Sequence, residues 1–140
     1  MKQYIVGFSL LMTGTILGIL ASPILPTQSN STGYSTNMIL RTDLQNIPGQ
    51  EVLIFASEWK PGAALPLHFH PDGHEFVYVV EGEQTFHFQE GGTKTVKAGE
   101  ALYTPPNVAH FGENPTDKLS KVVVFRIKDK TQPMSIEVSK

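Results

Sequence analysis

Residues 62–82 read GAALPLHFHPDGHEFVYVVEG, and much of the architecture can be worked out from this stretch. His68 and His70 are two residues apart, and Glu75 follows five residues after His70. Alternate side chains of an extended strand share a face, so the two imidazoles point the same way. The turn-forming residues 71–73 (Pro-Asp-Gly) can bring Glu75 back toward them. Two neutral imidazoles and one carboxylate form a ligand set for a divalent first-row metal.

A second stretch supplies a candidate fourth ligand. Residues 99–114 read GEALYTPPNVAHFGEN, in which His110 follows a Pro-Pro-Asn turn one short strand after Gly99. A histidine in such a position adds a third imidazole donor. Three histidines and a glutamate in a two-part pattern favour a metal site over surface or turn histidines, which would be the expected role of a lone histidine.

The two stretches together resemble the two cupin motifs, Gly-x5-His-x-His-x4-Glu-x6-Gly and Gly-x5-Pro-x-Gly-x2-His-x3-Asn. The matched positions are Gly62, His68, His70, Glu75 and Gly82 in the first motif, and Gly99, Pro105, His110 and Asn114 in the second. Asn107 stands where the second motif usually has glycine, and asparagine tolerates the positive φ of such a turn. The resemblance covers roughly residues 38–128. It implies a jelly-roll barrel whose metal ligands are His68, His70, Glu75 and His110.

Strand and turn patterns support the same fold class. Ten prolines and twelve glycines suit a turn-rich all-β domain, and we expect eight or nine short strands in a double-stranded β-helix, or jelly roll. The segments with strand character are 38–44, 51–59, 75–80, 84–89, 93–98, 100–104 and 119–127. The centre of 51–59 is apolar on both faces, which predicts a position inside a sheet.

The remaining parts of the chain are predicted to flank this domain. Residues 1–21 contain an uncharged hydrophobic run that begins at Ile5 and is expected to form a helix. This segment is predicted to be either a cleaved signal peptide or a membrane anchor through residues 4–21. Residues 22–37 have linker composition, residues 38–128 form the cupin domain, and residues 129–140 form a tail. Both interpretations of the hydrophobic run place the domain outside the cytoplasm, in the periplasm or secreted.

Composition excludes several functions. The formal net charge is −2, which gives no basic footprint for nucleic acid. Cysteine is absent, so disulfides, thiolate metal sites and a cysteine nucleophile are excluded. No sequence motif of a serine-hydrolase elbow, a phosphate-binding loop or a His-Glu-x-x-His helix is present.

Other side chains near the motifs receive weaker roles. His74 should face away from Glu75 in a strand, so it is left out of the ligand set. His87 is expected to face solvent or a cross-strand partner, and Asn114 to fix a turn. Trp59 and Lys60 are expected at the mouth of the site. Seven aromatic side chains are expected either to line a pocket or to belong to the core: Phe69, Phe76, Tyr78, Phe86, Phe88, Tyr103 and Phe111. The hydroxyl of Tyr103 needs a hydrogen-bond partner if it is buried.

Three functions are open to such a site. The first is a mononuclear metal oxidoreductase of the dioxygenase-like kind acting on a small oxygen-rich substrate, with Glu75 as metal ligand and proton acceptor. The second is a binding module for a small molecule or the metal, and the third is a metal-dependent isomerase or lyase. Fe, Mn, Ni, Co, Cu and Zn all suit these donors. A homodimer through sheet edges is expected.

Overall fold

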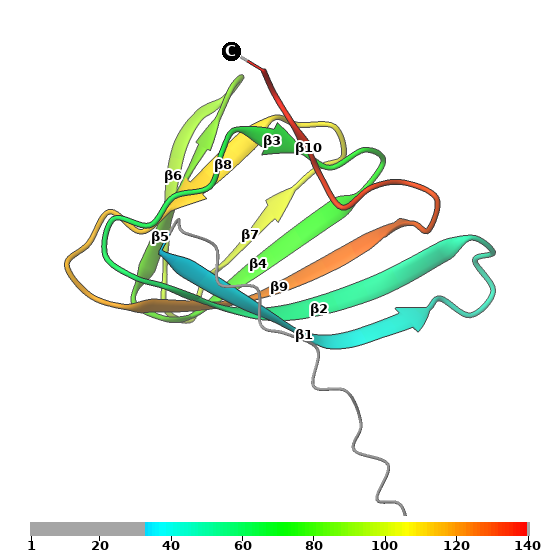
Figure 1. The fold of residues 1–140 in the computed structure, drawn as a ribbon, viewed down its shortest axis with the longest axis horizontal. Helices are drawn as coiled ribbons and strands as arrows, with labels where there is room; N and C mark the ends of the chain where they lie inside the picture. The colour runs from blue at the N-terminus through cyan, green and yellow to red at the C-terminus, as the bar shows by residue number, and fades with distance from the viewer. Residues whose placement is uncertain (1–32, 140) are drawn as a thin grey trace, which may run out of the picture.

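The computed structural model describes residues 33–139, in which all regular structure is β-strand (Figure 1). The ten strands are β1 (Tyr34–Asp43), β2 (Gln50–Trp59), β3 (His68–Phe69), β4 (His74–Glu81), β5 (Glu83–Phe88), β6 (Gly92–Lys97), β7 (Ala101–Thr104), β8 (His110–Glu113), β9 (Ser120–Asp129) and β10 (Ile136–Glu137). The all-β jelly roll is confirmed, with ten strands where eight or nine are predicted. The predicted N-terminal helix lies outside the described residues, and none of these residues forms a helix able to cross a membrane.

Two five-stranded antiparallel sheets face each other. One has the order β1-β2-β9-β4-β7 and the other the order β10-β3-β8-β5-β6. β9 lies at the centre of the first sheet, paired with β2 along ten residues and with β4 on its other side. β2 therefore has a strand on each side, as its apolar centre predicts.

Alternation along the strands separates an inner from an outer face. In β4 the residues Glu75, Val77 and Val79 are buried, while the residues between them are intermediate or exposed. The inner faces of both sheets form one apolar core. Its buried members are Trp59, Ala63, Val77, Val79, Phe86, Val96, Leu102 and Val122.

The ends of the folded part differ from the prediction. β1 begins at Tyr34, so residues 34–37 of the predicted linker are strand. The Ser57 hydroxyl donates a hydrogen bond of 2.9 Å to Oγ1 of Thr36 across the β1–β2 pair. The predicted tail also belongs to the fold, because β10 pairs with β3 and its segment closes over the barrel (Figure 1). Composition alone did not reveal these contacts, since they join segments far apart in the chain.

Positive φ angles support the turns that the motifs require. Asn107 has φ 63°, so asparagine does adopt the conformation for which the second motif usually uses glycine. Its side-chain amide donates to Asp72 Oδ1 at 3.1 Å and its Oδ1 accepts from the Asp72 amide at 3.2 Å. This reciprocal pair joins the turn after His70 to the turn before His110, and so connects the two motifs.

Candidate metal centre

Three histidine side chains converge inside the barrel. His68 lies on β3, His110 lies opposite it on β8, and His70 follows β3 directly. All three are buried, and their ligand nitrogens lie within 4.8 Å of one another. The separations of the ring centroids are 4.7 to 5.2 Å. The structure thus brings together the three histidines of the predicted ligand set.

Backbone carbonyls orient all three rings. Nδ1 of His68 lies 2.8 Å from the carbonyl oxygen of Pro66, and Nδ1 of His110 lies 2.9 Å from that of Val108. Nδ1 of His70 lies 2.8 Å from a third carbonyl oxygen, that of Met134. A carbonyl only accepts, so each Nδ1 carries the proton and each Nε2 of a neutral ring keeps its lone pair. This is the second-sphere arrangement typical of metal-binding histidines.

Glu75 lies against two of these nitrogens. Its Oε1 is 3.2 Å from Nε2 of His110, and its Oε2 is 3.2 Å from Nε2 of His70. The His70 contact lacks hydrogen-bond alignment, so this buried Nε2 has no hydrogen-bond partner among residues 33–139. Carboxylate oxygens and neutral Nε2 atoms are all electron-pair donors, and they need a cation between them. The donor set and the unpartnered nitrogen therefore fit a metal ion.

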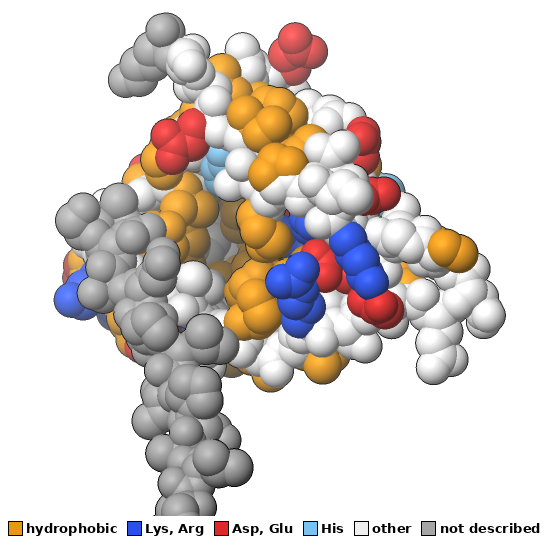
Figure 2. Space-filling model, turned by 45° about the vertical axis from the view of Figure 1, so that its right-hand side comes forward, with side chains coloured by type: hydrophobic (Ala, Val, Ile, Leu, Met, Phe, Trp, Pro, Cys, Tyr) orange, Lys and Arg blue, Asp and Glu red, His pale blue; other side chains and the backbone are white. Residues whose placement is uncertain are grey.

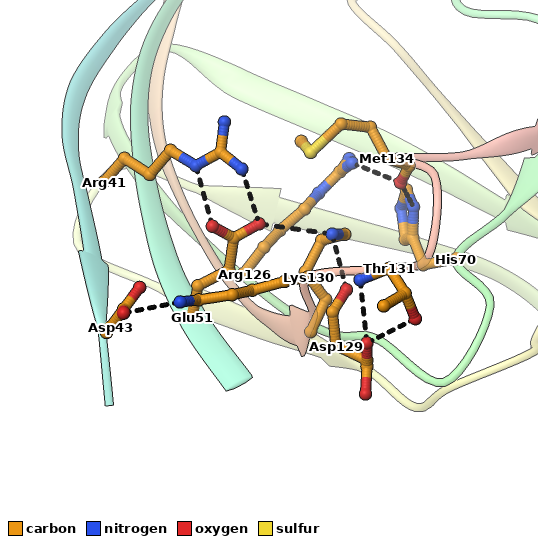
Figure 3. Close-up of polar contacts among 10 residues, drawn as sticks. Arg41, Asp43, Glu51, His70, Arg126, Asp129, Lys130, Thr131 and Met134 are labelled. Carbon is orange, nitrogen blue, oxygen red and sulfur yellow. Dashed lines mark hydrogen bonds and ion pairs between the residues drawn. The ribbon is translucent and has the colours of Figure 1, made fainter. Parts of the chain in front are cut away.

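Arg126 is a site residue that sequence reasoning missed. Its Nε and Nη2 donate to Oε2 of Glu75 at 2.9 and 2.6 Å. Its Nη1 donates to the Met134 carbonyl at 3.0 Å (Figure 3). That carbonyl is also the partner of His70, so one backbone group of the C-terminal segment joins both side chains. The signal available in the sequence was a cation directly after the apolar run 122–125; its position opposite Glu75 comes from the strand register.

Burial and charge set the protonation states. Burial lowers the pKa of His68 to about 4, so the ring is neutral at pH 7 and ready to donate to a metal. For Glu75 burial alone would raise the pKa, but the Arg126 charge and the contacts with His110 and His70 hold it well below its usual value. The carboxylate is therefore ionised although it is only 4% exposed.

A cavity of about 460 Å³ opens beside the site. The polar part of its lining comprises His68, Glu75, His110 and Arg126 together with Thr36, Ser57, Gln84, Ser135 and Glu137, and apolar side chains of both sheets line the rest. Figure 2 shows the hollow with hydrophobic side chains on its walls and with basic and acidic ones gathered on its rim. The volume falls in the range of small-molecule sites.

The predicted pocket aromatics mostly lie elsewhere. Of the seven, only Phe86 lines the cavity, whereas Phe76, Tyr78 and Tyr103 lie on the outer face and are exposed. These three residues occupy positions in β4 and β7 whose side chains point out of the barrel. For them, neither the predicted pocket role nor the predicted core role is correct. Trp59 is buried in the core and lines the cavity, while Lys60 is exposed.

The other predicted roles can be placed as well. His74 points away from the three histidines, and its Nδ1 contacts the Tyr103 hydroxyl at 2.8 Å. His87 pairs with Glu113 across β5 and β8, as expected, with 2.7 Å between Nε2 and Oε1. Asn114 fixes a turn: its amide donates to the carbonyls of Trp59 and Lys118.

A separate ionic cluster lies on the first sheet. Glu51 accepts from Arg41 Nε at 2.7 Å and from Lys128 Nζ at 3.2 Å (Figure 3). Both Glu51 and Lys128 are buried. Their charges are already paired, so this cluster contributes structure and leaves the three histidines as the candidate centre.

The fold and this centre define a class: a jelly-roll barrel whose three inward histidines could hold a metal ion. The Cupin domain family matches residues 55–126, just over half of the chain. The chain therefore belongs to the cupin family.

Individual relatives support this assignment. A germin-like protein (subfamily 2 member 2) of Arabidopsis thaliana is 34% identical over 96 residues, which are 64% of this chain and 43% of that protein. Oxalate decarboxylase of Bacillus subtilis (strain 168) is 35% identical over 63 residues, 42% of this chain and 16% of that protein. A solved oxalate oxidase in complex with glycolate superposes with a TM-score of 0.60 at 21% identity, over 78% of this chain and 57% of that one. The chain spans less than half the length of the germin-like relatives.

Proposed function

We propose that this chain is an exported mononuclear metal oxidoreductase, dioxygenase-like in kind, that acts on a small oxygen-rich acid. His68, His70, Glu75 and His110 would hold one divalent ion, chosen from Fe, Mn, Ni, Co, Cu and Zn. The observation that carries the proposal is the set of three buried imidazoles whose Nδ1 protons are fixed on carbonyls, which leaves Nε2 of each ring for a metal. Export rests on the hydrophobic run of residues 5–21.

A bound ion would supply Lewis acidity and, for each of these metals except Zn, redox chemistry. The chain's own residues supply binding and proton transfer. Glu75 is ionised and buried, and it would take up a proton from a substrate beside it when its contact with Arg126, which holds its pKa low, is broken. The apolar walls around Val77, Phe86 and Val124 keep water away from the reacting group.

Arg126 indicates what kind of substrate the cavity would accept. Its guanidinium lines the cavity, and this planar fork matches a carboxylate in a bidentate manner. With Glu75 serving as a metal ligand, the guanidinium of Arg126 would be available to a substrate carboxylate. The similarity to an oxalate oxidase solved with glycolate agrees with a small acid.

One observation favours the second candidate, a binding module without turnover. Both strong contacts of Arg126 go to Oε2 of Glu75, so the carboxylate that touches His70 and His110 is already paired. If that ion pair persists in the metal-bound protein, Glu75 is a poor proton acceptor. The cavity would then retain an acid without converting it.

Elemental analysis of the full chain, purified without chelator, tests the proposal. We expect about one equivalent of a redox metal, lost in the His68→Ala/His110→Ala variant and kept in His87→Ala, a histidine outside the centre. Oxygen uptake with glycolate, oxalate and enediols should follow the metal content. Metal without oxygen uptake but with turnover would favour an isomerase or lyase, and metal with tight acid binding only would favour the binding module. No metal after reconstitution would refute a metal function.

Fractionation of the producing cells, with N-terminal sequencing of the product, tests export. A product that begins near residue 22 indicates a cleaved signal peptide, and an intact N-terminus in the membrane fraction indicates a tether. An intact product in the cytoplasm would contradict the proposed location.

A further inference from the structure

Two buried polar atoms in the wall of the cavity have no hydrogen-bond partner among residues 33–139. They are Nε1 of Trp59 and Oε1 of Gln84. Trp59 is 6% exposed and Gln84 is 1% exposed, and both side chains line the cavity that opens beside the metal centre. Polar groups that are shut off from water without a partner cost folding free energy. A molecule that occupies the cavity can supply the partners that these two atoms lack.

Strand pairing places these two side chains together. Trp59 on β2 lies opposite Ser120 on β9 in the strand register. The side-chain amide of Gln84, on β5 of the other sheet, donates to the hydroxyl of the same Ser120. Ser120 therefore has Trp59 beside it and Gln84 across the barrel from it. We call Trp59 and Gln84 the inner polar pair.

The inner polar pair lies at the opposite end of the cavity from the metal centre. β9 connects the two ends, because Ser120 lies opposite Trp59, whereas Arg126 lies opposite Glu75. Both Ser120 and Arg126 have inward parity on this strand. The six residues from one to the other correspond to about 20 Å of extended strand.

The section between the two ends is mostly apolar. The apolar side chains that line it include Val77, Phe86, Val122 and Val124. Ser57 and Thr36 also line it, but the Ser57 hydroxyl donates to Oγ1 of Thr36, so these hydroxyls bond to each other. A few polar groups on an apolar lining are what orients a ligand in a small-molecule site.

The cavity is also larger than a two-carbon acid requires. Its volume of about 460 Å³ equals that of about fifteen water molecules. An acid such as glycolate would fill the metal end and leave the apolar section and the inner polar pair without contacts.

We propose that the inner polar pair binds the terminal hydroxyl of an elongated hydroxy acid whose carboxylate lies at the metal centre. This inference rests on the proposed function and deepens it, because it assigns the substrate an apolar body and a hydroxyl at its far end. A hydroxyl both donates and accepts, so it bonds to Oε1 of Gln84 and to the Nε1 proton of Trp59 at once. A carboxylate only accepts and an ammonium only donates, so neither satisfies both atoms.

Trp59 is the only tryptophan in the sequence, so its fluorescence reports binding at this end of the cavity. The probes are ω-hydroxy acids added to the full chain, from glycolate up to about twelve carbons, which suits a span of roughly 20 Å less the reach of the side chains at both ends. We expect saturating glycolate to leave the emission unchanged, and affinity to rise with chain length to a maximum at which the emission shifts. A shift of equal size with glycolate, or no shift at any length, would overturn the proposal.

The hydroxyl itself is tested at the chain length that binds best. Calorimetry should show that the ω-hydroxy acid binds at least about tenfold more tightly than the fatty acid of the same length. Gln84→Met and Trp59→Phe each remove one polar atom and keep most of the bulk, so each should lower this ratio at least about twofold. Gln89→Met, at an exposed glutamine after β5, should keep the ratio. Trp59→Phe and the wild-type ratio decide the matter if Gln84→Met does not fold.

A fatty acid that binds as tightly as the hydroxy acid would overturn the proposal, because water or another part of the chain would then satisfy the two atoms. The ratio of the two affinities does not depend on what holds the carboxylate. Failure of the metal function would therefore appear as missing metal with the ratio intact. Failure of this proposal would appear as a ratio near one in protein that carries its metal.

Discussion

Replacing Arg126 with glutamine should destabilise the metal-free protein strongly. The substitution keeps side-chain length and polarity but removes the positive charge beside Glu75. In the wild type that carboxylate is 4% exposed and ionised, and it receives two charge-assisted hydrogen bonds from the guanidinium. The variant leaves a buried anion whose remaining contacts are the two imidazoles of His70 and His110.

The size of the effect follows from the burial of both partners. Removing one partner of a buried ion pair costs about 3–5 kcal/mol. The Arg126 side chain is 14% exposed, so water partly solvates the pair and we expect the lower end, about 3 kcal/mol. At about 4–8 °C per kcal/mol for a domain of this size, the midpoint of thermal unfolding should fall by roughly 12 °C or more.

Urea unfolding at pH 7 measures this loss, with two controls. Arg41→Gln removes an arginine that is 57% exposed from the buried Glu51. Because Glu51 keeps its contact with Lys128, this variant should lose less than about 1 kcal/mol of unfolding free energy. The Glu75→Gln/Arg126→Gln double variant should recover most of the loss, because no charge remains unpaired. Added Mn²⁺ should reduce the difference in unfolding free energy between the wild type and Arg126→Gln, since a bound ion supplies positive charge beside Glu75. A loss no larger than that of Arg41→Gln, or a double variant as unstable as Arg126→Gln, would refute the reasoning.

Two further predictions concern His68 and Gly82. The pKa of His68 in the folded protein is about 4, below its usual 6.5, so the unfolded chain binds more protons between these two pH values. In urea unfolding of the metal-free protein, the free energy of unfolding should therefore be highest above pH 6.5 and lower by about 3 kcal/mol at pH 4. A His68→Asn variant whose unfolding free energy fell equally steeply with pH would contradict this cause. Gly82→Ala places a Cβ 2.9 Å from the Leu119 carbonyl oxygen at φ +75°, so it should destabilise by about 2 kcal/mol or more. Gly99→Ala, whose φ is +89° with no atom within 4 Å of the new Cβ, should cost less in the same thermal unfolding assay, and equal losses would contradict the clash.

The metal-site histidines could be predicted because they depend on local rules. The spacing of His68 and His70 fixes a shared direction in any extended segment, and the family resemblance supplied His110. The structure brings these three rings together, while the role of Glu75 as fourth ligand stays a prediction. Asn107 was predictable for the same reason, since the backbone angle of one residue decides it.

What could not be predicted depends on pairing between distant segments. Arg126 is 51 residues from Glu75, and only the β4–β9 register shows that they face each other. The Met134 carbonyl lies beyond the predicted domain, and no side-chain pattern announces a backbone acceptor. Tyr103 was misplaced because whether a strand residue faces inward depends on the parity of β7 relative to β4, which the sequence leaves open.

The central position of β9 determines when the protein can fold during its synthesis. β9 separates β2 from β4, and the Met134 carbonyl that orients His70 comes later still. A chain that emerges from its N-terminus therefore presents His68 and His70 about fifty residues before β9 begins and about sixty residues before the Met134 carbonyl that orients His70. Contacts of such long sequence separation form slowly. The centre is thus assembled only after Met134 has been released, and a metal ion bound there would come from the compartment in which this last step of folding takes place.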